Sequence, residues 1–167
     1  MSRLSFHSQW LCVAAVASLR ATCSRRAVGC VLTDSRGRVL STGYNGPASG
    51  LPHCTDSPCK GASLPSGTGL DACEAIHAEQ NALTWCKDPS SIFHVYTTVS
   101  PCVHCTKMLL GTPANHIWFH ERYAHDQAAR GLWEAAGRTW THRPLPAGLV
   151  EALGRLSSFE HTALPPL

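Results

Sequence analysis

Apolar residues recur along this chain with two different periods. A spacing of three or four predicts helices over residues 8–20, 74–86, 102–110, 126–136 and 147–156. Short apolar runs and alternation, bounded by turn residues, predict strands over residues 27–33, 39–44, 93–99, 117–120 and 138–142. Strands and helices in this order predict an α/β fold, a three-layer α/β/α arrangement around a five-stranded mixed sheet.

One stretch between the second strand and the second helix has no apolar period. Residues 45–72 are rich in Gly, Pro, Ser and Cys and are far longer than an ordinary connection in a compact domain. We expect this stretch to be either disordered or held by another interaction. A length of 167 residues, 44% of them hydrophobic, suits one domain. We predict that domain over 1–143, with a cysteine-rich insert at 45–73, followed by a C-terminal extension with a short helix over 144–167.

Composition narrows the range of partners and compartments. The net charge is only +3 and no run of Lys or Arg occurs, so we expect no nucleic-acid partner. No apolar run is long enough to cross a membrane, and the N-terminus lacks the pattern of a secretory signal. Cysteines that cluster with His and Glu are typical of metal ligands in a reducing compartment. We therefore expect a cytoplasmic protein without a membrane partner.

Two short motifs carry the chemistry, H-A-E at 77–79 and P-C-V-H-C at 101–105. Cys102 and Cys105 are three apart, so both thiols lie on one face of a helical turn. With His77 they make three protein ligands for zinc and leave a fourth position open, as catalytic rather than structural zinc sites do. Glu79 is not needed as a ligand and can carry protons. The competing interpretation is a structural zinc knuckle, or Cys and His residues that are simply buried.

This pair of motifs is a known signature of zinc-dependent nucleobase deaminases. Two thiolates and a neutral imidazole balance the charge of Zn²⁺, which still lowers the pKa of a bound water to roughly 7. We expect Glu79 to take the proton of that water, deliver it to the ring nitrogen and later protonate the departing ammonia.

A second metal site is predicted in the cysteine-rich insert. Cys54 and Cys59 lie within it, Cys73 closes it, and Cys23 falls between the first helix and the first strand. If these four converge, they form a closed structural zinc site that would order a loop too polar to fold by burial. His53 adjoins Cys54 and could replace one thiolate.

These motifs and their neighbours resemble the deoxycytidylate (dCMP) deaminases of bacteria and phages, within the zinc-dependent cytidine/deoxycytidylate deaminase family. The resemblance runs from about residue 11 to 142 and is carried by the segments 22–26, 28–29, 42–46, 50–54, 73–82, 100–105 and 107–108. It implies a cytidine deaminase-like fold. It also implies hydrolysis of dCMP, or of a 5-substituted dCMP, to dUMP and ammonia, which supplies dUMP for thymidylate synthesis. If a phage encodes the chain, the compartment is the host cytoplasm.

The resemblance also implies substrate contacts, each with a plainer alternative. Asn45 matches the residue that meets the sugar hydroxyl, although Asn-Gly also favours a turn by itself. Arg26 would meet the phosphate, or be a solvated surface arginine. Tyr123 would lie near the base or phosphate, or be a core tyrosine. Ala78, inside the first motif, and Ser100, directly before the second, are expected to line the substrate site.

Regulation and assembly are implied only by the resemblance. Tyr44 and Gly46 lie in the segment that binds a nucleotide effector in regulated members, with dCTP as activator, dTTP as inhibitor and Mg²⁺ accompanying the nucleotide. Many members form homo-oligomers, often hexamers. The chain departs from the family pattern at Ala27, at residues 111–115 and beyond residue 144, which weakens the prediction of an oligomer interface and of regulation.

Three other functions share part of this pattern. Adenosine deaminases that act on tRNA contain both motifs, but they lack the long cysteine loop and usually have a more basic surface. Free cytidine deaminases typically have Cys at the position of His77. A zinc-stabilised binding module without catalysis would not need Glu79.

Overall fold

The structure is a computed structural model that describes residues 3–65 and 67–159. Its helices are α1 (Phe6–Ser18), α2 (Ala78–Thr84), α3 (Val103–Leu110), α4 (Gln127–Ala135) and α5 (Ala147–Phe159), with short 3₁₀ turns at Leu70–Ala72 and Pro89–Ser91. Its strands are β1 (Gly29–Thr33), β2 (Val39–Tyr44), β3 (Gly46–Pro47), β4 (Ala75–Ile76), β5 (His94–Val99), β6 (His116–Glu121) and β7 (Thr139–His142).

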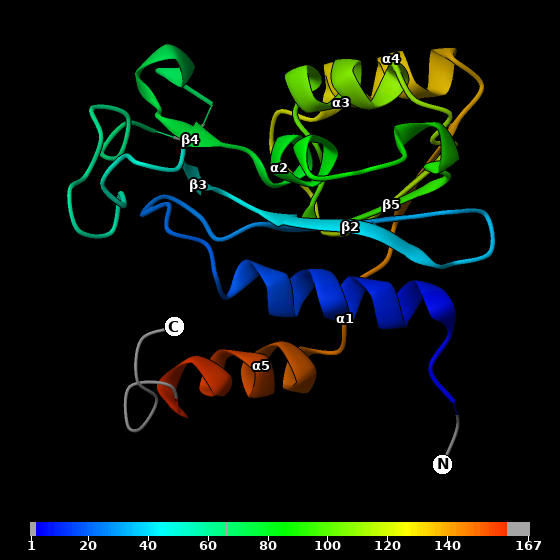
Figure 1. The fold of residues 1–167 in the computed structure, drawn as a ribbon, viewed down its shortest axis with the longest axis horizontal. Coiled ribbons are helices and arrows are strands. Elements are labelled where there is room, and N and C mark those ends of the chain that lie inside the picture. Colours follow the sequence, from blue (N-terminus) through cyan, green and yellow to red (C-terminus); the bar gives the residue numbers. More distant parts are fainter. Residues whose placement is uncertain (1–2, 66, 160–167) are drawn as a thin grey trace.

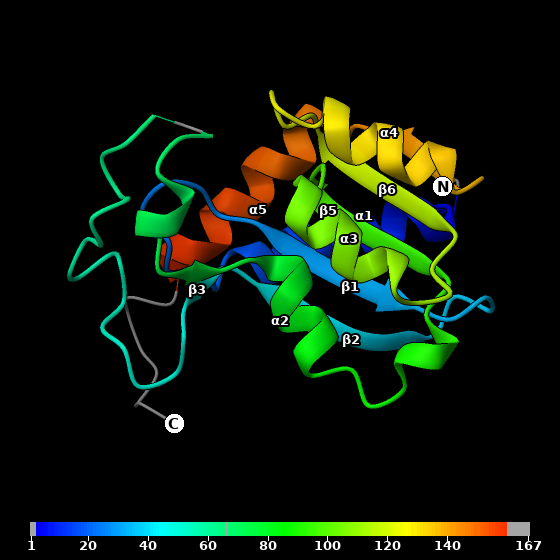
Figure 2. The same cartoon turned by 90° about the horizontal axis from the view of Figure 1, so that it is seen from above.

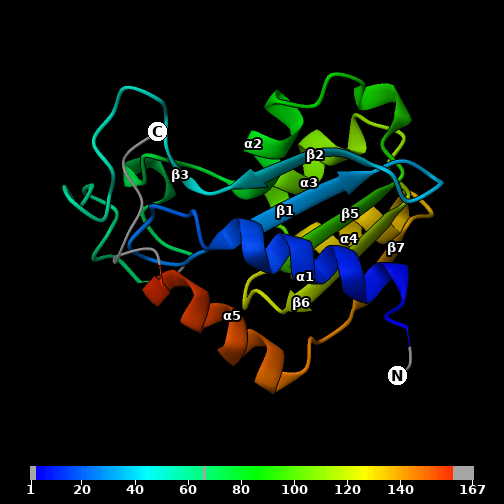
Figure 3. The ribbon, with the colours of Figure 1, turned by 60° about the horizontal axis from the view of Figure 1, so that its bottom comes forward.

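Five strands form one mixed sheet, as the sequence predicts, and their order is β2-β1-β5-β6-β7. β1 is antiparallel to β2 and to β5, whereas β5, β6 and β7 run parallel to one another. Helices α2, α3 and α4 cover one face and α1 covers the other (Figures 1 and 2). The α/β/α prediction is confirmed, and the C-terminal helix α5 adds a further element outside α1 (Figure 3).

Each face of the sheet has its own apolar core. On the face of α2, α3 and α4, Leu32, Val95 and Phe119 from the strands pack with Leu109 and Trp133 from the helices, all fully buried. The second core lies under α1. The strand residues Val31 and Tyr96 meet Leu11 and Ala14 there, and Leu145 and Leu149 reach it from the start of the C-terminal extension.

The start of the extension is therefore packed against the domain. The predicted helix over 147–156 is present and runs to Phe159. The predicted remainder of the extension, residues 160–167, lies outside the described residues. No helix among those that the structure describes is long and apolar enough to cross a membrane.

The helix that the sequence predicts over 74–86 is wrong at its start. Ala75 and Ile76 instead form β4, which pairs antiparallel with β3 in a separate two-stranded sheet. The helix begins only at Ala78, and His77 is its N-cap, whose N–H donates to Gln80 Oε1 at 2.8 Å. Two-residue strands leave no readable periodicity, so the sequence pattern assigned them to the helix that follows.

The cysteine-rich insert is folded against the segment that precedes β1. Thr22 N–H donates to the carbonyl of Asn45 at 3.1 Å, and Thr55 N–H donates to the carbonyl of Thr22 at 3.2 Å. Within the insert, Gly61 N–H donates to the carbonyl of Ala72 at 2.9 Å. Of the two alternatives for this stretch, the structure thus favours a held loop over a disordered one.

A glycine in β2 allows α2 to lie directly on the sheet. A Cβ at Gly43 would lie 2.2 Å from the carbonyl oxygen of Ala78 and 2.5 Å from the nitrogen of Ala82, both of them backbone atoms of α2. Next to it, Ser41 Oγ donates to the carbonyl of Ala82 at 2.6 Å. The contact with β2 therefore fixes the distance between α2 and the sheet.

The change Gly43→Ala should lower the free energy of unfolding by about 1–3 kcal/mol, because the new methyl group overlaps backbone that cannot rotate away. Thermal or urea unfolding measures this loss. Gly131→Ala is the matched control, since a Cβ at Gly131 in α4 meets nothing within 4 Å. That control should be neutral or gain up to about 1 kcal/mol from helix propensity. Equal stability of the two variants would contradict the role given to Gly43.

Candidate functional site

The three predicted metal ligands come together at the N-termini of two helices. His77 is the N-cap of α2, Cys102 is the N-cap of α3, and Cys105 lies in the first turn of α3. His77 Nδ1 lies 3.5 Å from Cys102 Sγ and 3.4 Å from Cys105 Sγ. Within residues 3–65 and 67–159, no other group of three or more His, Cys, Asp or Glu ligand atoms lies within 4.8 Å of one another.

This geometry fits zinc. Zn–S bonds of about 2.3 Å and Zn–N bonds of about 2.0–2.1 Å in a tetrahedral site separate neighbouring N and S ligand atoms by about 3.6 Å. The observed separations of 3.4 and 3.5 Å agree with that value without rearrangement. Two sulfur ligands and one imidazole are a zinc donor set, and three protein ligands leave one position for water or substrate.

Hydrogen bonds among the three ligands shift their pKa values in opposite directions. A hydrogen bond from Cys105 lowers the pKa of Cys102 to about 3, so Cys102 is a thiolate at neutral pH. The same hydrogen bond, together with burial, raises the pKa of Cys105. A hydrogen bond with Cys102 raises the pKa of His77. A metal ion competes with these protons, because thiolate and neutral imidazole are the forms that bind it.

Glu79 lies beside the ligands as the second residue of α2. Its side chain is only 4% exposed, and burial raises the pKa of its carboxyl. It borders the same cavity as His77 and Cys102. A carboxyl whose pKa is raised by burial holds a proton more readily than an exposed one, which suits a general acid–base group.

The cavity above these residues has a volume of about 550 Å³, which suits a small organic ligand. The five residues that the sequence predicts as substrate contacts all line it: Arg26, Asn45, Ala78, Ser100 and Tyr123. The cavity is also lined by Ser24, Leu64 and Val99, for which the sequence predicts no substrate contact. Leu64 comes from the cysteine-rich insert, so the insert forms part of the cavity wall.

Asn45 is already engaged by the backbone on both sides of its amide. Its Nδ2 donates to the carbonyl of Arg26 and its Oδ1 accepts from Val28 N–H, each at 2.7 Å. The side chain is 8% exposed. Asn45 therefore fixes the segment that leads into β1. Its second amide hydrogen and its second oxygen lone pair are the groups left for a contact with a sugar.

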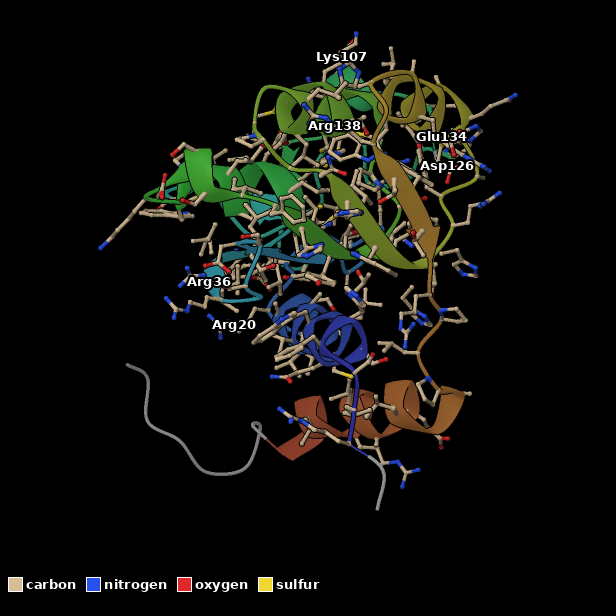
Figure 4. The ribbon with its side chains drawn as sticks, turned by 90° about the vertical axis from the view of Figure 1, so that its right-hand side faces the viewer. Arg20, Arg36, Lys107, Asp126, Glu134 and Arg138 are labelled. Carbon is tan, nitrogen blue, oxygen red and sulfur yellow. The ribbon has the colours of Figure 1, made fainter. Side chains whose placement is uncertain are left out.

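A second buried network holds Tyr123 in the cavity wall. Ser100 Oγ donates to Asp126 Oδ2 at 2.8 Å and accepts from Tyr123 N–H at 2.7 Å. Asp126, labelled beside α4 in Figure 4, is 6% exposed. The role of this aspartate is not predicted from the sequence, because nothing in the local pattern distinguishes it from an ordinary residue at a helix start.

Neither of the two predicted effector residues is among the residues that line this cavity, although both flank Asn45, which does line it. Tyr44 ends β2, and its carbonyl accepts from Asn81 Nδ2 at 2.7 Å. Gly46 opens β3, where a Cβ would lie 2.3 Å from Thr22 Oγ1. The described structure gives Gly46 a packing role, while effector binding by both residues stays a prediction.

The predicted second zinc site is only partly assembled. Cys54 Sγ lies 3.7 Å from Cys59 Sγ, close to the separation of about 3.8 Å that two sulfurs on one tetrahedral zinc would have. A hydrogen bond from Ser24 Oγ, 3.2 Å away, lowers the pKa of Cys54 to about 7. Cys23 and Cys73 instead border the cavity. Within the described ranges, no three of these cysteines and His53 have ligand atoms within 4.8 Å of one another.

Comparison with protein families places this site in a known group. A family model described as the cytidine and deoxycytidylate deaminase zinc-binding region matches residues 4–121. The chain is 35% identical over 123 residues to a deoxycytidylate deaminase of Mycobacterium phage D29, a match that covers 70% of this chain and 95% of that protein.

Longer and more distant relatives agree with this match. The chain is 32% identical over 139 residues to a deoxycytidylate deaminase of Schizosaccharomyces pombe, covering 81% of this chain but only 43% of that protein. The crystal structure of a dCMP deaminase from the cyanophage S-TIM5, in complex with dCMP and dUMP, superimposes with a TM-score of 0.66 at 23% identity. That match covers 86% of this chain and 100% of the other, and it shows a shared fold.

Proposed function

The chain belongs to the cytidine and deoxycytidylate deaminase family, and on that basis we propose that it hydrolyses dCMP, with a 5-substituted dCMP as a further candidate, to dUMP and ammonia. The product would supply thymidylate synthesis. The observation that carries the proposal is the His77, Cys102 and Cys105 cluster beside buried Glu79 at one cavity. A site that only stabilised the fold would not need this buried carboxyl, since taking a carboxyl out of water is costly.

The residues of the site have two separate roles, metal binding and proton transfer. His77, Cys102 and Cys105 would hold the ion, and zinc in such a site lowers the pKa of a bound water to roughly 7. Glu79 would accept a proton from that water and deliver it to the ring nitrogen of the cytosine. It would then take the second proton of the former water from the new ring-carbon hydroxyl and pass it to the exocyclic amine as ammonia leaves, so that one carboxyl serves as base and as acid.

A single nucleotide suits the cavity better than a polynucleotide does. Arg25 and Arg26 precede β1 and line the cavity with Asn45, which gives room for one sugar and one phosphate. Insert residues 62, 64, 67 and 73 wall the cavity, and the net charge is only +3. These features favour dCMP over an adenosine within a tRNA stem. His77 in the ligand set argues against a free cytidine deaminase.

Assembly and regulation remain predictions from the family resemblance. A homo-oligomer such as a hexamer, effector binding by dCTP or dTTP with Mg²⁺, and a cytoplasmic location are consistent with family membership. The chain matches less than half of the length of the yeast deoxycytidylate deaminases, so we carry their activity over as part of this proposal.

The substrate proposal predicts a strong preference for the phosphorylated nucleoside. Without the phosphate, the polar groups arranged around it would be left without a partner, so kcat/KM for deoxycytidine should be at least about 10²-fold below that for dCMP. Ammonia release from dCMP, 5-methyl-dCMP, CMP and deoxycytidine measures this preference directly. Equal turnover of deoxycytidine and dCMP would move the protein to the nucleoside deaminases.

We further propose a structural zinc held by Cys23, Cys54, Cys59 and Cys73, supported by the spacing of Cys54 and Cys59. Elemental analysis should then find two zinc ions per chain. Cys102→Ala and Cys59→Ser should each lose one of them, and Cys59→Ser should also melt at a lower temperature because the insert depends on its metal. Cys12→Ala, which alters a cysteine of α1, is the control and should keep both. One zinc in the parent would refute the second site.

A further inference from the structure

We propose that Glu121 is a specificity-determining residue, which limits the negative charge that Arg26 can accept on a nucleotide. The inference rests on the proposed function. Arg26 Nη2 donates to Glu121 Oε2 at 2.5 Å, and the two side chains are 43% and 51% exposed. Arg26 lines the cavity, whereas Glu121 does not. The arginine expected to meet the phosphate is therefore already bound to a carboxylate from outside the cavity wall.

The ion pair spans the end of the sheet at which the site lies. Arg26 precedes β1 and Glu121 ends β6, and β5 runs between those two strands. Since β1 is antiparallel to β5 and β6 is parallel to it, the start of β1 and the end of β6 both lie at the end of β5. That end of β5 leads directly to Cys102, so the pair bridges the chain just before the metal ligands.

Buried residues of the cavity hold the main chain on both sides of this bridge. The carbonyl of Arg26 accepts from Asn45 Nδ2 at 2.7 Å, and the carbonyl of Glu121 accepts from Ser100 N–H at 2.8 Å. Asn45 and Ser100 are 8% and 3% exposed. These contacts hold both backbones in place, and the ion pair itself joins two half-exposed side chains.

The arginines next to this ion pair have other partners, and Glu121 is the carboxylate bound to Arg26. Arg25 donates instead to the carbonyl of Pro65 at 2.8 Å. On the other side, His120 Nε2 lies 3.9 Å from Glu121 Oε1, and Arg122 Nε lies 3.8 Å from Asp126 Oδ2. A phosphate bound by the remaining N–H groups of Arg26 would lie next to the Glu121 carboxylate. Repulsion grows with the charge of the ligand, so a diphosphate would be penalised more than a monophosphate.

The change Glu121→Gln tests this inference, because it removes the charge and keeps an oxygen that can accept from Arg26. We expect KM for dCMP to fall by about two- to five-fold, the range that one exposed charge commonly contributes. The ratio of kcat/KM for dCDP to kcat/KM for dCMP should rise, and kcat/KM for deoxycytidine should stay the same. The gain should shrink at high salt, since the interaction is partly exposed.

A matched control is available on α4. Arg130 Nε and Glu134 Oε1 form another exposed pair at 2.8 Å, with side chains 44% and 45% exposed, and neither residue lines the cavity. Glu134, labelled in Figure 4, can be changed to Gln without touching the site. Glu134→Gln should leave KM and kcat/KM for dCMP, dCDP and deoxycytidine unchanged.

A double-mutant cycle identifies Arg26 as the intermediary. In an Arg26→Gln background, KM for dCMP should be raised and Glu121→Gln should give no further gain. Equal KM for parent and Glu121→Gln, or the same gain without Arg26, would overturn the inference and leave the proposed function intact. Absence of dCMP turnover by the parent would overturn the function instead. In that case calorimetric titration of inorganic phosphate into the parent, the two single variants and the double variant still tests the effect of Glu121 on Arg26. Equal Kd values for the four proteins would refute that effect.

Discussion

The structure depends on the close approach of two helix N-termini above one end of a mixed sheet. His77 and Cys102 are the N-caps of α2 and α3, so each ligand occupies a position set by the helix start rather than by a flexible loop. Thiolates are favoured at helix N-termini, where backbone N–H groups point outward. This effect agrees with the lowered pKa of Cys102, the N-cap of α3.

The sheet determines how these helix starts meet. Gly43 lets α2 lie on β2 with no side chain between them, and β5 delivers Ser100 and Cys102 to the start of α3. At the opposite end of α3, Arg138 donates to the carbonyl of Ala114 at 2.7 Å and to that of Leu110 at 3.2 Å (Figure 4). Backbone contact, and not only apolar packing, therefore holds α2 against the sheet.

Much of this arrangement could be predicted from the amino-acid sequence because the signals are local. The H-A-E and P-C-x-x-C motifs identify the ligands, and apolar periodicity locates each strand of the main sheet. The N-cap position of His77 could not be predicted, since it follows from β4 pairing with a strand thirty residues earlier. The roles of Asp126 and Glu121 were equally hidden. Each depends on a partner far along the chain, Ser100 and Arg26 respectively, and a polar residue in isolation gives no indication of that partner.

The central claim is that Glu79 moves protons in a site whose metal is held by other residues. The most direct measurement determines zinc content and the rate of dCMP deamination for parent and Glu79→Gln. The account predicts unchanged zinc and a turnover at least about 10²-fold lower, because Gln keeps the size of Glu but cannot exchange the proton. Activity within about tenfold of the parent, with zinc retained, would contradict the mechanism.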